Sequence, residues 1–189
     1  MQTDPAPRTA LLLMDLQIAI LQNYPDADAL LDRIRVALAA ARRVGMPVLW
    51  VRVCFRDGYP EVSPRNLAFA GIVQSGRLLE SDPNSAIHPS LDLQPHDVVV
   101  TKRRFGAFAG SDLDVVLRGV GIDTLVLAGV STSGVVLSTV RLAADLDYRI
   151  TVLADGCADG DAEVHRVLTG KVFPKQATVQ TVEAWVATL

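Results

Sequence analysis

The sequence predicts an α/β protein, a three-layer α/β/α sandwich on a mostly parallel six-stranded sheet. Short apolar runs such as 9–14, 48–53 and 124–128 lie between turn signals, which is typical of strands buried on both faces. Segments with helical spacing of apolar residues separate these runs. Strands that alternate with helices pair in parallel through right-handed crossovers, so we expect helices on both faces of the sheet.

The first half of the chain is expected to form two strands and one long helix. Strand 9–14 ends at Asp15-Leu16-Gln17, an amphipathic helix spans 26–44, and the second strand is 48–53. The segment 54–96 is rich in Pro and Gly, with weak helical signals near 67–73. A segment of this length without clear elements is typical of a lid or binding insert.

The second half is expected to supply the other four strands, at 97–101, 124–128, 149–153 and 177–180. Helices are predicted over 112–118, from Val135 to Leu146, from Asp161 to about Val172, and over 181–189. Gly129 is expected to end the fourth strand. Three possible N-cap residues follow it, so this stretch predicts a strand, a tight turn and a helix, with the caps at Ser131, Thr132 and Ser133.

Composition restricts the class of partner. The chain of 189 residues is 50% hydrophobic and 21% charged, which suits one globular domain over 1–189. Its net charge of −3 gives no attraction to nucleic acid or to an anionic membrane surface, and its apolar runs are too short to span a bilayer. Without a visible export signal, we expect a cytoplasmic protein with Cys54 and Cys157 as free thiols.

Three features fall at the carboxyl ends of predicted strands. They are Asp15 after the first strand, Lys102 after the third, and the turn 129–135 after the fourth. A parallel sheet brings such positions to one edge, where ligands bind. A partly buried carboxylate beside an ammonium group can transfer protons. The N–H groups at the start of the following helix, around Ser133 to Val135, are expected to bind an anion or an oxyanion.

These stretches also resemble the isochorismatase-like (cysteine hydrolase) superfamily over nearly the whole chain. Asp15 in Leu-Leu-Met-Asp-Leu-Gln is similar to the catalytic Asp of this superfamily. Lys102 in Thr-Lys-Arg-Arg-Phe-Gly-Ala-Phe is similar to the catalytic Lys of the superfamily, although Gly106 stands where the family has Ser. The third similar stretch is Gly129-x-x-Thr132-x-x-Val135-Val136-x-x-Thr139-x-x-x-Ala143.

The resemblance implies a Rossmann-like three-layer fold, catalytic roles for Asp15 and Lys102, and a cis peptide at Val130–Ser131. It also implies a homo-oligomer, for which Trp185 is a candidate interface residue. The residues expected to bind the substrate around the pair are Gln17, Phe105, Val130, Ser131, Ser133, Gly134 and Val135.

Val135 is the main departure from the family pattern, because the cysteine hydrolases have their nucleophilic Cys at this position. Valine cannot attack a carbonyl, so a thioester mechanism cannot operate from here. The isochorismatase branch has Gly at the position and cleaves a vinyl ether with the Asp as acid. That branch also has a Gln after the second strand, which has no counterpart in the local sequence Cys54 to Tyr59.

No metal and no other cofactor is expected. The nicotinamidase metal site uses His ligands near the Asp, whereas His88, His96 and His165 are scattered here, and His165 is expected on an exposed helix face. Arg52, Arg56 and Arg77 border or lie within the insert, where one of them can bind a substrate carboxylate or simply form surface ion pairs.

Three hypotheses follow. The first is a small-molecule hydrolase in which Asp15 performs acid/base chemistry, without a Cys nucleophile, on a carboxylate-bearing or carbonyl compound. The second is a catalytically inactive small-molecule binding protein on the same fold, which Val135 favours and the retained Asp15 and Lys102 disfavour. The third is a hydrolase with Cys54 as a relocated nucleophile, although free Cys is more often a buried and inert residue.

Overall fold

The computed structural model describes residues 8–189. Its centre is a six-stranded sheet in the order β3-β2-β1-β4-β5-β6, and every pair of neighbouring strands is parallel. This confirms the predicted fold class. The strands are β1 (Thr9–Met14), β2 (Val48–Val53), β3 (Val98–Lys102), β4 (Thr124–Val130), β5 (Arg149–Ala158) and β6 (Thr178–Gln180).

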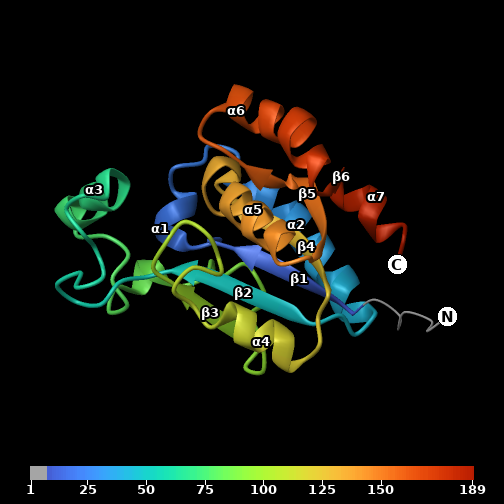
Figure 1. Cartoon of the computed structure of the whole chain (residues 1–189), viewed down its shortest axis with the longest axis horizontal. Helices are drawn as coiled ribbons and strands as arrows, with labels where there is room; N and C mark the ends of the chain where they lie inside the picture. Colours follow the sequence, from blue (N-terminus) through green and yellow to red (C-terminus); the bar gives the residue numbers. More distant parts are fainter. Residues whose placement is uncertain (1–7) are drawn as a thin grey trace.

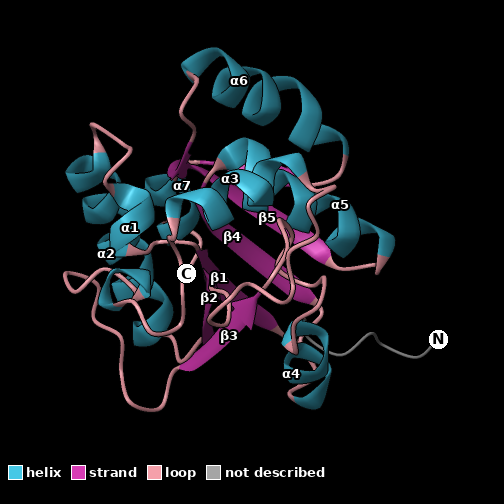
Figure 2. Ribbon diagram, turned by 90° about the vertical axis from the view of Figure 1, so that its left-hand side faces the viewer, coloured by secondary structure: helices cyan, strands magenta, loops and turns pink. Residues whose placement is uncertain are grey.

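Helices cover both faces of the sheet (Figures 1 and 2). Successive residues of β1 point to opposite faces, since side chains alternate along a strand. Leu11 and Leu13 pack in the core shared with α2 and α7, whereas Leu12 and Met14 pack in the core shared with α4 and α5. The bounds of these helices are α2 (Ala27–Arg43), α7 (Val182–Val186), α4 (Leu113–Gly119) and α5 (Leu137–Asp145).

The C-terminal part adds a long helical segment and returns to the core. It consists of α6 (Ala162–Val167), η3 (Leu168–Val172) and η4 (Phe173–Lys175), of which Leu168 and Phe173 are buried. Trp185 on α7 is 4% exposed and packs in the α2 core, so the expectation that this side chain serves an interface is wrong. Within residues 8–189, no helix has both the length and the apolar composition to cross a membrane.

The expected insert between β2 and β3 contains two short helices, α3 (Leu67–Ser75) and η1 (Pro83–Ser85). Figure 1 shows α3 beyond the end of the sheet from which β2 leaves, with α1 (Ile18–Leu21) between α3 and the sheet. The weak helical signal near 67–73 thus corresponds to α3, while α1 was not expected from the sequence. A lid function for the insert stays a prediction.

Strand β4 continues past its predicted end. Gly129 and Val130 pair with Cys157 and Ala158 of β5, so Gly129 does not end the strand. Gly129 has φ +141, and a Cβ atom there would lie 2.1 Å from the carbonyl oxygen of Met14. Glycine is therefore required because the β1 backbone approaches closely, and not because the chain turns.

The segment after β4 begins with the cis peptide Val130–Ser131, as the family resemblance implied. A π-helical turn, η2 (Thr132–Val136), then leads into α5. The expected capping by hydroxyl groups is wrong here. Ser131 makes no side-chain capping hydrogen bond, and the Thr132 hydroxyl bonds to His165 instead.

Candidate active site

The sheet register brings the predicted site residues to one edge. Met14 of β1 lies opposite Gly129 of β4, so Asp15 follows β1 beside the cis peptide. Lys102 is the last residue of β3 and pairs with Val53 of β2, from where its side chain reaches across the end of β2 to Asp15. From β1, the chain first adds β2 and β3 on one side of the sheet and then β4, β5 and β6 on the other side. In open α/β sheets, ligands bind at the carboxyl ends of the strands where the order changes direction in this way.

Asp15 and Lys102 form a buried ion pair. The Lys102 Nζ atom lies 2.8 Å from Asp15 Oδ2 and donates a second hydrogen bond of 3.0 Å to the carbonyl of Arg104. The two residues are 5% and 2% exposed. The other carboxylate oxygen, Asp15 Oδ1, is buried and has no hydrogen-bond partner among the described residues.

Burial raises the pKa of Asp15, and the charge and hydrogen bond of Lys102 oppose that shift without cancelling it. The carboxyl group therefore holds a proton to higher pH than an exposed aspartate does. Asp15 also has φ +56, a left-handed conformation that aspartate tolerates better than most residues. The arrangement can give and take a proton at Oδ1 while Oδ2 stays on the ammonium group.

Three side chains from other parts of the chain lie at the turn after the cis peptide. Tyr24, which precedes α2, lies close enough to Ser131 for the Ser131 side chain to influence the pKa of its hydroxyl. His165 Nδ1 lies 2.8 Å from Thr132 Oγ1, and Asp159 Oδ2 accepts a hydrogen bond of 2.6 Å from the Ser133 N–H. His165 is half-buried, so its predicted place on an exposed helix face is wrong.

The sequence interpretation did not include Tyr24 or Asp159. Asp159 directly follows β5, so its place at a strand end was a usable signal, whereas nothing in the sequence around Tyr24 points to the site.

Two N–H groups of the expected anion site on the helix start, those of Ser133 and Gly134, already bond within the chain. The Ser133 N–H donates to Asp159, and the Gly134 N–H donates to the Ser131 carbonyl at 3.2 Å. Val135 is 2% exposed and packs in the core cluster that includes Met14 and Phe108. The expectation of free N–H groups at Ser133 and Gly134 is therefore corrected.

Gln17 is fully buried, and its amide group bonds to the backbone of its own chain. Its Oε1 accepts from the Val53 N–H at 2.8 Å, and its Nε2 donates to the carbonyls of Val53 at 3.0 Å and Ser85 at 2.7 Å. These bonds join the ends of β1 and β2 to η1. A binding role for Gln17 stays a prediction, and the structure gives it this anchoring role as well.

Phe105 connects the insert to the site. The residue is 45% exposed, and its ring stacks on that of Phe69 in α3 at a centroid distance of 4.9 Å. On its other side, a Cβ atom placed on Gly134 would lie 3.9 Å from Phe105 Cδ1. Phe105 therefore lies between α3 and the turn that follows β4, where it can contact a bound molecule.

The two cysteines are buried. Cys54 Sγ lies 3.7 Å from Gln17 Nε2 and 3.8 Å from the Ser85 carbonyl, and burial raises the pKa of this thiol. Burial also raises the pKa of Cys157, to about 12. Both shifts disfavour the thiolate, which is the nucleophilic form of cysteine.

The arginines of the insert region bond to groups of this chain. Arg52 donates to Thr101 at 3.1 Å, Arg56 pairs with Glu61 at 2.5 Å, and Arg77 donates to the Ala19 carbonyl. Within the part of the chain that the structure describes, no group of three or more His, Cys, Asp or Glu side chains is arranged to hold a metal ion.

Fold and geometry together define an α/β protein with a buried carboxylate–ammonium pair at the carboxyl edge of a parallel sheet. The profile of the isochorismatase domain matches residues 9–184. The uncharacterized isochorismatase family protein YecD of Escherichia coli O157:H7 is 35% identical over 182 residues, covering 94% of each chain. An isochorismatase family protein from Burkholderia thailandensis superposes with a TM-score of 0.81 at 32% identity, covering 97% of this chain and 96% of that chain.

A further relative is the ureidoacrylate amidohydrolase RutB of Stutzerimonas stutzeri. It is 31% identical over 210 residues, which cover 97% of this chain and 81% of the relative. The chain belongs to the isochorismatase family. This membership places it among the isochorismatase-like hydrolases.

Proposed function

We propose that the chain hydrolyses a small molecule with Asp15 as the acid/base group and without a cysteine nucleophile. The observation that carries this proposal is the state of the Asp15 carboxyl group. One oxygen lies 2.8 Å from Lys102 Nζ, and the other is buried at the strand-end edge without a partner among residues 8–189. The name of the RutB relative, an amidohydrolase, supports a hydrolytic reaction.

The proposed reaction uses water as the nucleophile. Asp15 takes a proton from the water molecule as its oxygen bonds to the substrate carbonyl carbon, and gives that proton to the leaving group as the bond to that group breaks. Lys102 stays an ammonium group and stabilises the carboxylate form of Asp15. No covalent intermediate forms on the protein, which agrees with a buried valine at position 135.

The proposed substrate is a small carbonyl compound or carboxylate that binds over the cis peptide. Val130 and Gly134 would lie beneath it, and Phe105 would contact it from the side of α3. Phe105 is suited to this because its exposed ring stacks on Phe69 of the insert. A cytoplasmic location and a homo-oligomeric state stay predictions, and light scattering on the purified protein tests the second.

The test is turnover on a panel of primary amides, N-carbamoyl amides, simple esters and isochorismate-type vinyl ethers. It compares the wild type, Asp15→Asn, and the double variant Cys54→Ser/Cys157→Ser, which contains no thiol because the chain has two cysteines. We expect the thiol-free variant to retain activity and Asp15→Asn to lose about 100-fold or more in kcat. Retained activity in Asp15→Asn, with its fold verified by circular dichroism, would contradict the proposal.

The alternatives give different outcomes in the same experiment. A thiol nucleophile at Cys54 predicts that the thiol-free variant is inactive, although burial and the raised pKa of Cys54 argue against this. A binding protein without catalysis predicts no turnover on any substrate, together with ligands that raise the melting temperature. The buried valine at position 135 is the observation that favours this second candidate.

A further inference from the structure

A groove lies beside β3, the edge strand of the sheet. Its volume is about 910 Å³, which is within the range of small-molecule sites. Its walls come from the insert after β2, from β3 itself, and from the loop after β3 together with α4. Neither Asp15 nor Lys102 nor a residue of the cis peptide lines this β3 groove, so it is separate from the candidate active site.

Three arginine side chains line the β3 groove: Arg56 from the insert, and Arg103 and Arg104 from the loop after β3. Arg103 is held in place by two carboxylates, because it pairs with Glu80 and its Nε atom lies 3.1 Å from Glu61 Oε1. Arg56 is exposed and pairs with Glu61 through one nitrogen, Nη1. A guanidinium group has several N–H donors, so Arg56 retains donors for a ligand.

Arg104 has no carboxylate partner among the described residues. Its Nη1 atom donates to the Arg103 carbonyl at 2.7 Å, and the residue is exposed. Glu61 and Asp112 are the two acidic residues of the lining, so arginines outnumber acidic side chains there although the whole chain has a net charge of −3. The planar guanidinium group matches the geometry of carboxylates and phosphates, so this lining suits an anion.

Apolar side chains form another part of the same wall. Val99 of β3 is 37% exposed and Val115 of α4 is 73% exposed, although valine is among the residues most often buried. Covering exposed apolar surface is favourable, at about 25 cal/mol per Å² removed from water. A ligand with an apolar body next to its anionic group can therefore gain from both kinds of lining.

We propose that the β3 groove is a second ligand site, which binds a small organic anion. Arg56 and Arg104 bind the carboxylate or phosphate head group of this ligand, while Val99 and Val115 contact its aliphatic or aromatic body. The inference goes beyond the proposed function, because it involves neither the catalytic pair nor hydrolysis.

The test is isothermal titration calorimetry at low ionic strength with benzoate and phenyl phosphate, and with benzyl alcohol as a neutral probe of similar shape. We expect both anions to bind wild type, and benzyl alcohol to bind more weakly by about tenfold or more, as expected when charge-assisted hydrogen bonds are absent. The anion that binds more tightly identifies the preferred head group, and either order supports the proposal.

Three variants test the charges of the lining. Arg56→Gln and Arg104→Gln should each weaken the binding of both anions by about tenfold, because each removes a charged donor. Asp112→Asn should strengthen the binding of both anions, because it removes a like charge from the groove. Circular dichroism spectra verify that all variants are folded.

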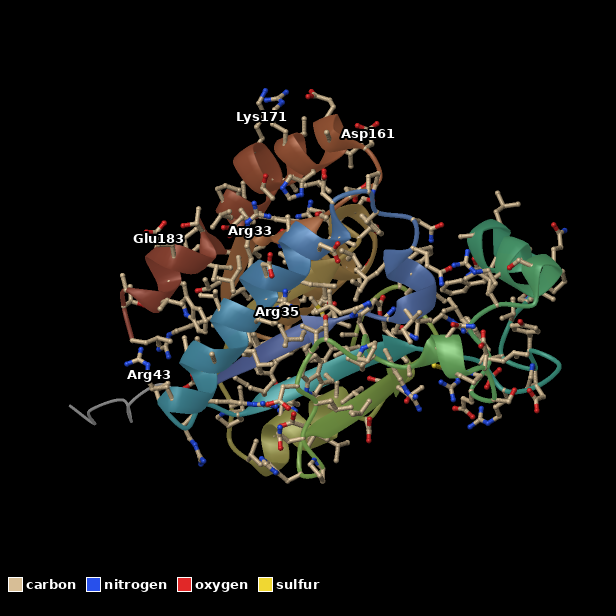
Figure 3. All side chains as sticks on the ribbon, turned by 180° about the vertical axis from the view of Figure 1, so that it is seen from behind. Arg33, Arg35, Arg43, Asp161, Lys171 and Glu183 are labelled. Carbon is tan, nitrogen blue, oxygen red and sulfur yellow. The ribbon has the colours of Figure 1, made fainter. Side chains whose placement is uncertain are left out.

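Two further variants locate the bound anion. Val115→Thr keeps the shape of the side chain but makes it polar, so it should weaken the binding of both anions, whereas an anion bound beside Asp15 would not respond to it. Arg35→Gln is the matched control. Arg35 is an exposed arginine that pairs with Asp32 on α2, the helix that covers the other face of the sheet from α4 (Figure 3). Its substitution should leave all affinities as in wild type.

Several outcomes overturn the inference. They are equal binding of benzyl alcohol and the anions, unchanged anion affinity in both Arg56→Gln and Arg104→Gln, an equal loss of affinity in Arg35→Gln, and no binding of either anion to wild type. Because the experiment measures binding and changes no residue of the catalytic pair, its result is independent of the proposed function. A chain that hydrolyses no substrate but binds anions in this arginine-dependent way would still support the inference.

Discussion

Lys102 Nζ lies 2.8 Å from Asp15 Oδ2 at a place where both side chains are almost entirely removed from solvent. The position follows from the sheet, because Lys102 ends β3 and the Asp15 N–H donates to the carbonyl of Val51 in β2 at 2.8 Å. Removing two charges from water costs several kcal/mol per ion, and their mutual attraction offsets part of that cost. Neither partner can therefore be removed alone without leaving an uncompensated buried group.

The first prediction concerns this pair. Lys102→Met should lower the free energy of unfolding at neutral pH by about 3–5 kcal/mol, because it leaves the Asp15 carboxylate buried without a counter-ion. Urea unfolding measures the loss, which should shrink at low pH where Asp15 takes up a proton. The double variant Asp15→Asn/Lys102→Met serves as the control and should be less destabilised than Lys102→Met. A single variant as stable as wild type would contradict the buried pair.

The second prediction concerns the pH dependence of stability at His165. Burial lowers the pKa of this imidazole, and the charge of Asp159 opposes the shift. The unfolded chain takes up the proton near pH 6.5, whereas the folded protein takes it up only at lower pH. The stability that neutral His165 contributes is therefore present above pH 6.5 and is lost as the pH falls through the lower folded pKa.

The measurement is the difference in unfolding free energy between wild type and His165→Gln, from urea titrations between pH 5 and 7.5. This difference should decrease as the pH falls, with a slope of at most about 1.4 kcal/mol per pH unit for one proton. His96→Gln, at an exposed position, is the matched control for the substitution itself. A pH-independent difference for His165→Gln would show that the imidazole has an ordinary pKa.

The strands and the Asp15–Lys102 pair are predictable from the sequence for one reason. Runs buried on both faces stand out in the sequence, and parallel strands bring their carboxyl ends to one edge. The contacts that hold the turn are not predictable in this way. Thr132 and His165 are 33 residues apart in sequence, and their hydrogen bond depends on how α6 packs beside the turn. Local patterns carry no information about such a contact.

Gly129 shows how a local interpretation fails. Glycine between an apolar run and a group of hydroxyl residues indicates a turn, but here the residue is required by contact with β1. The third prediction tests this requirement. Gly129→Ala should lower the free energy of unfolding by at least about 2–3 kcal/mol, because it adds a Cβ 2.1 Å from the Met14 carbonyl oxygen at a φ of +141.

The control for this change is Gly160→Ala. A Cβ at Gly160 meets no atom within 4 Å, so the substitution should alter the unfolding free energy by no more than about 0.5 kcal/mol. Thermal or urea unfolding of both variants gives the comparison. Equal stability of the two variants would mean that β1 and β4 are further apart in solution than in the structure.

The fourth prediction separates the two roles of Gln17. Gln17→Met keeps a side chain of similar length but removes the amide group that hydrogen-bonds Val53 and Ser85. The substitution should lower the free energy of unfolding by about 3 kcal/mol, because buried backbone groups lose their hydrogen-bond partners. Gln22→Met, at an exposed position of the same segment, is the control and should change stability little. If Gln17 mainly binds the substrate, Gln17→Met should instead be nearly as stable as wild type and raise KM alone. An anchoring role predicts loss of stability, with kcat and KM altered only to the extent that the site is disordered.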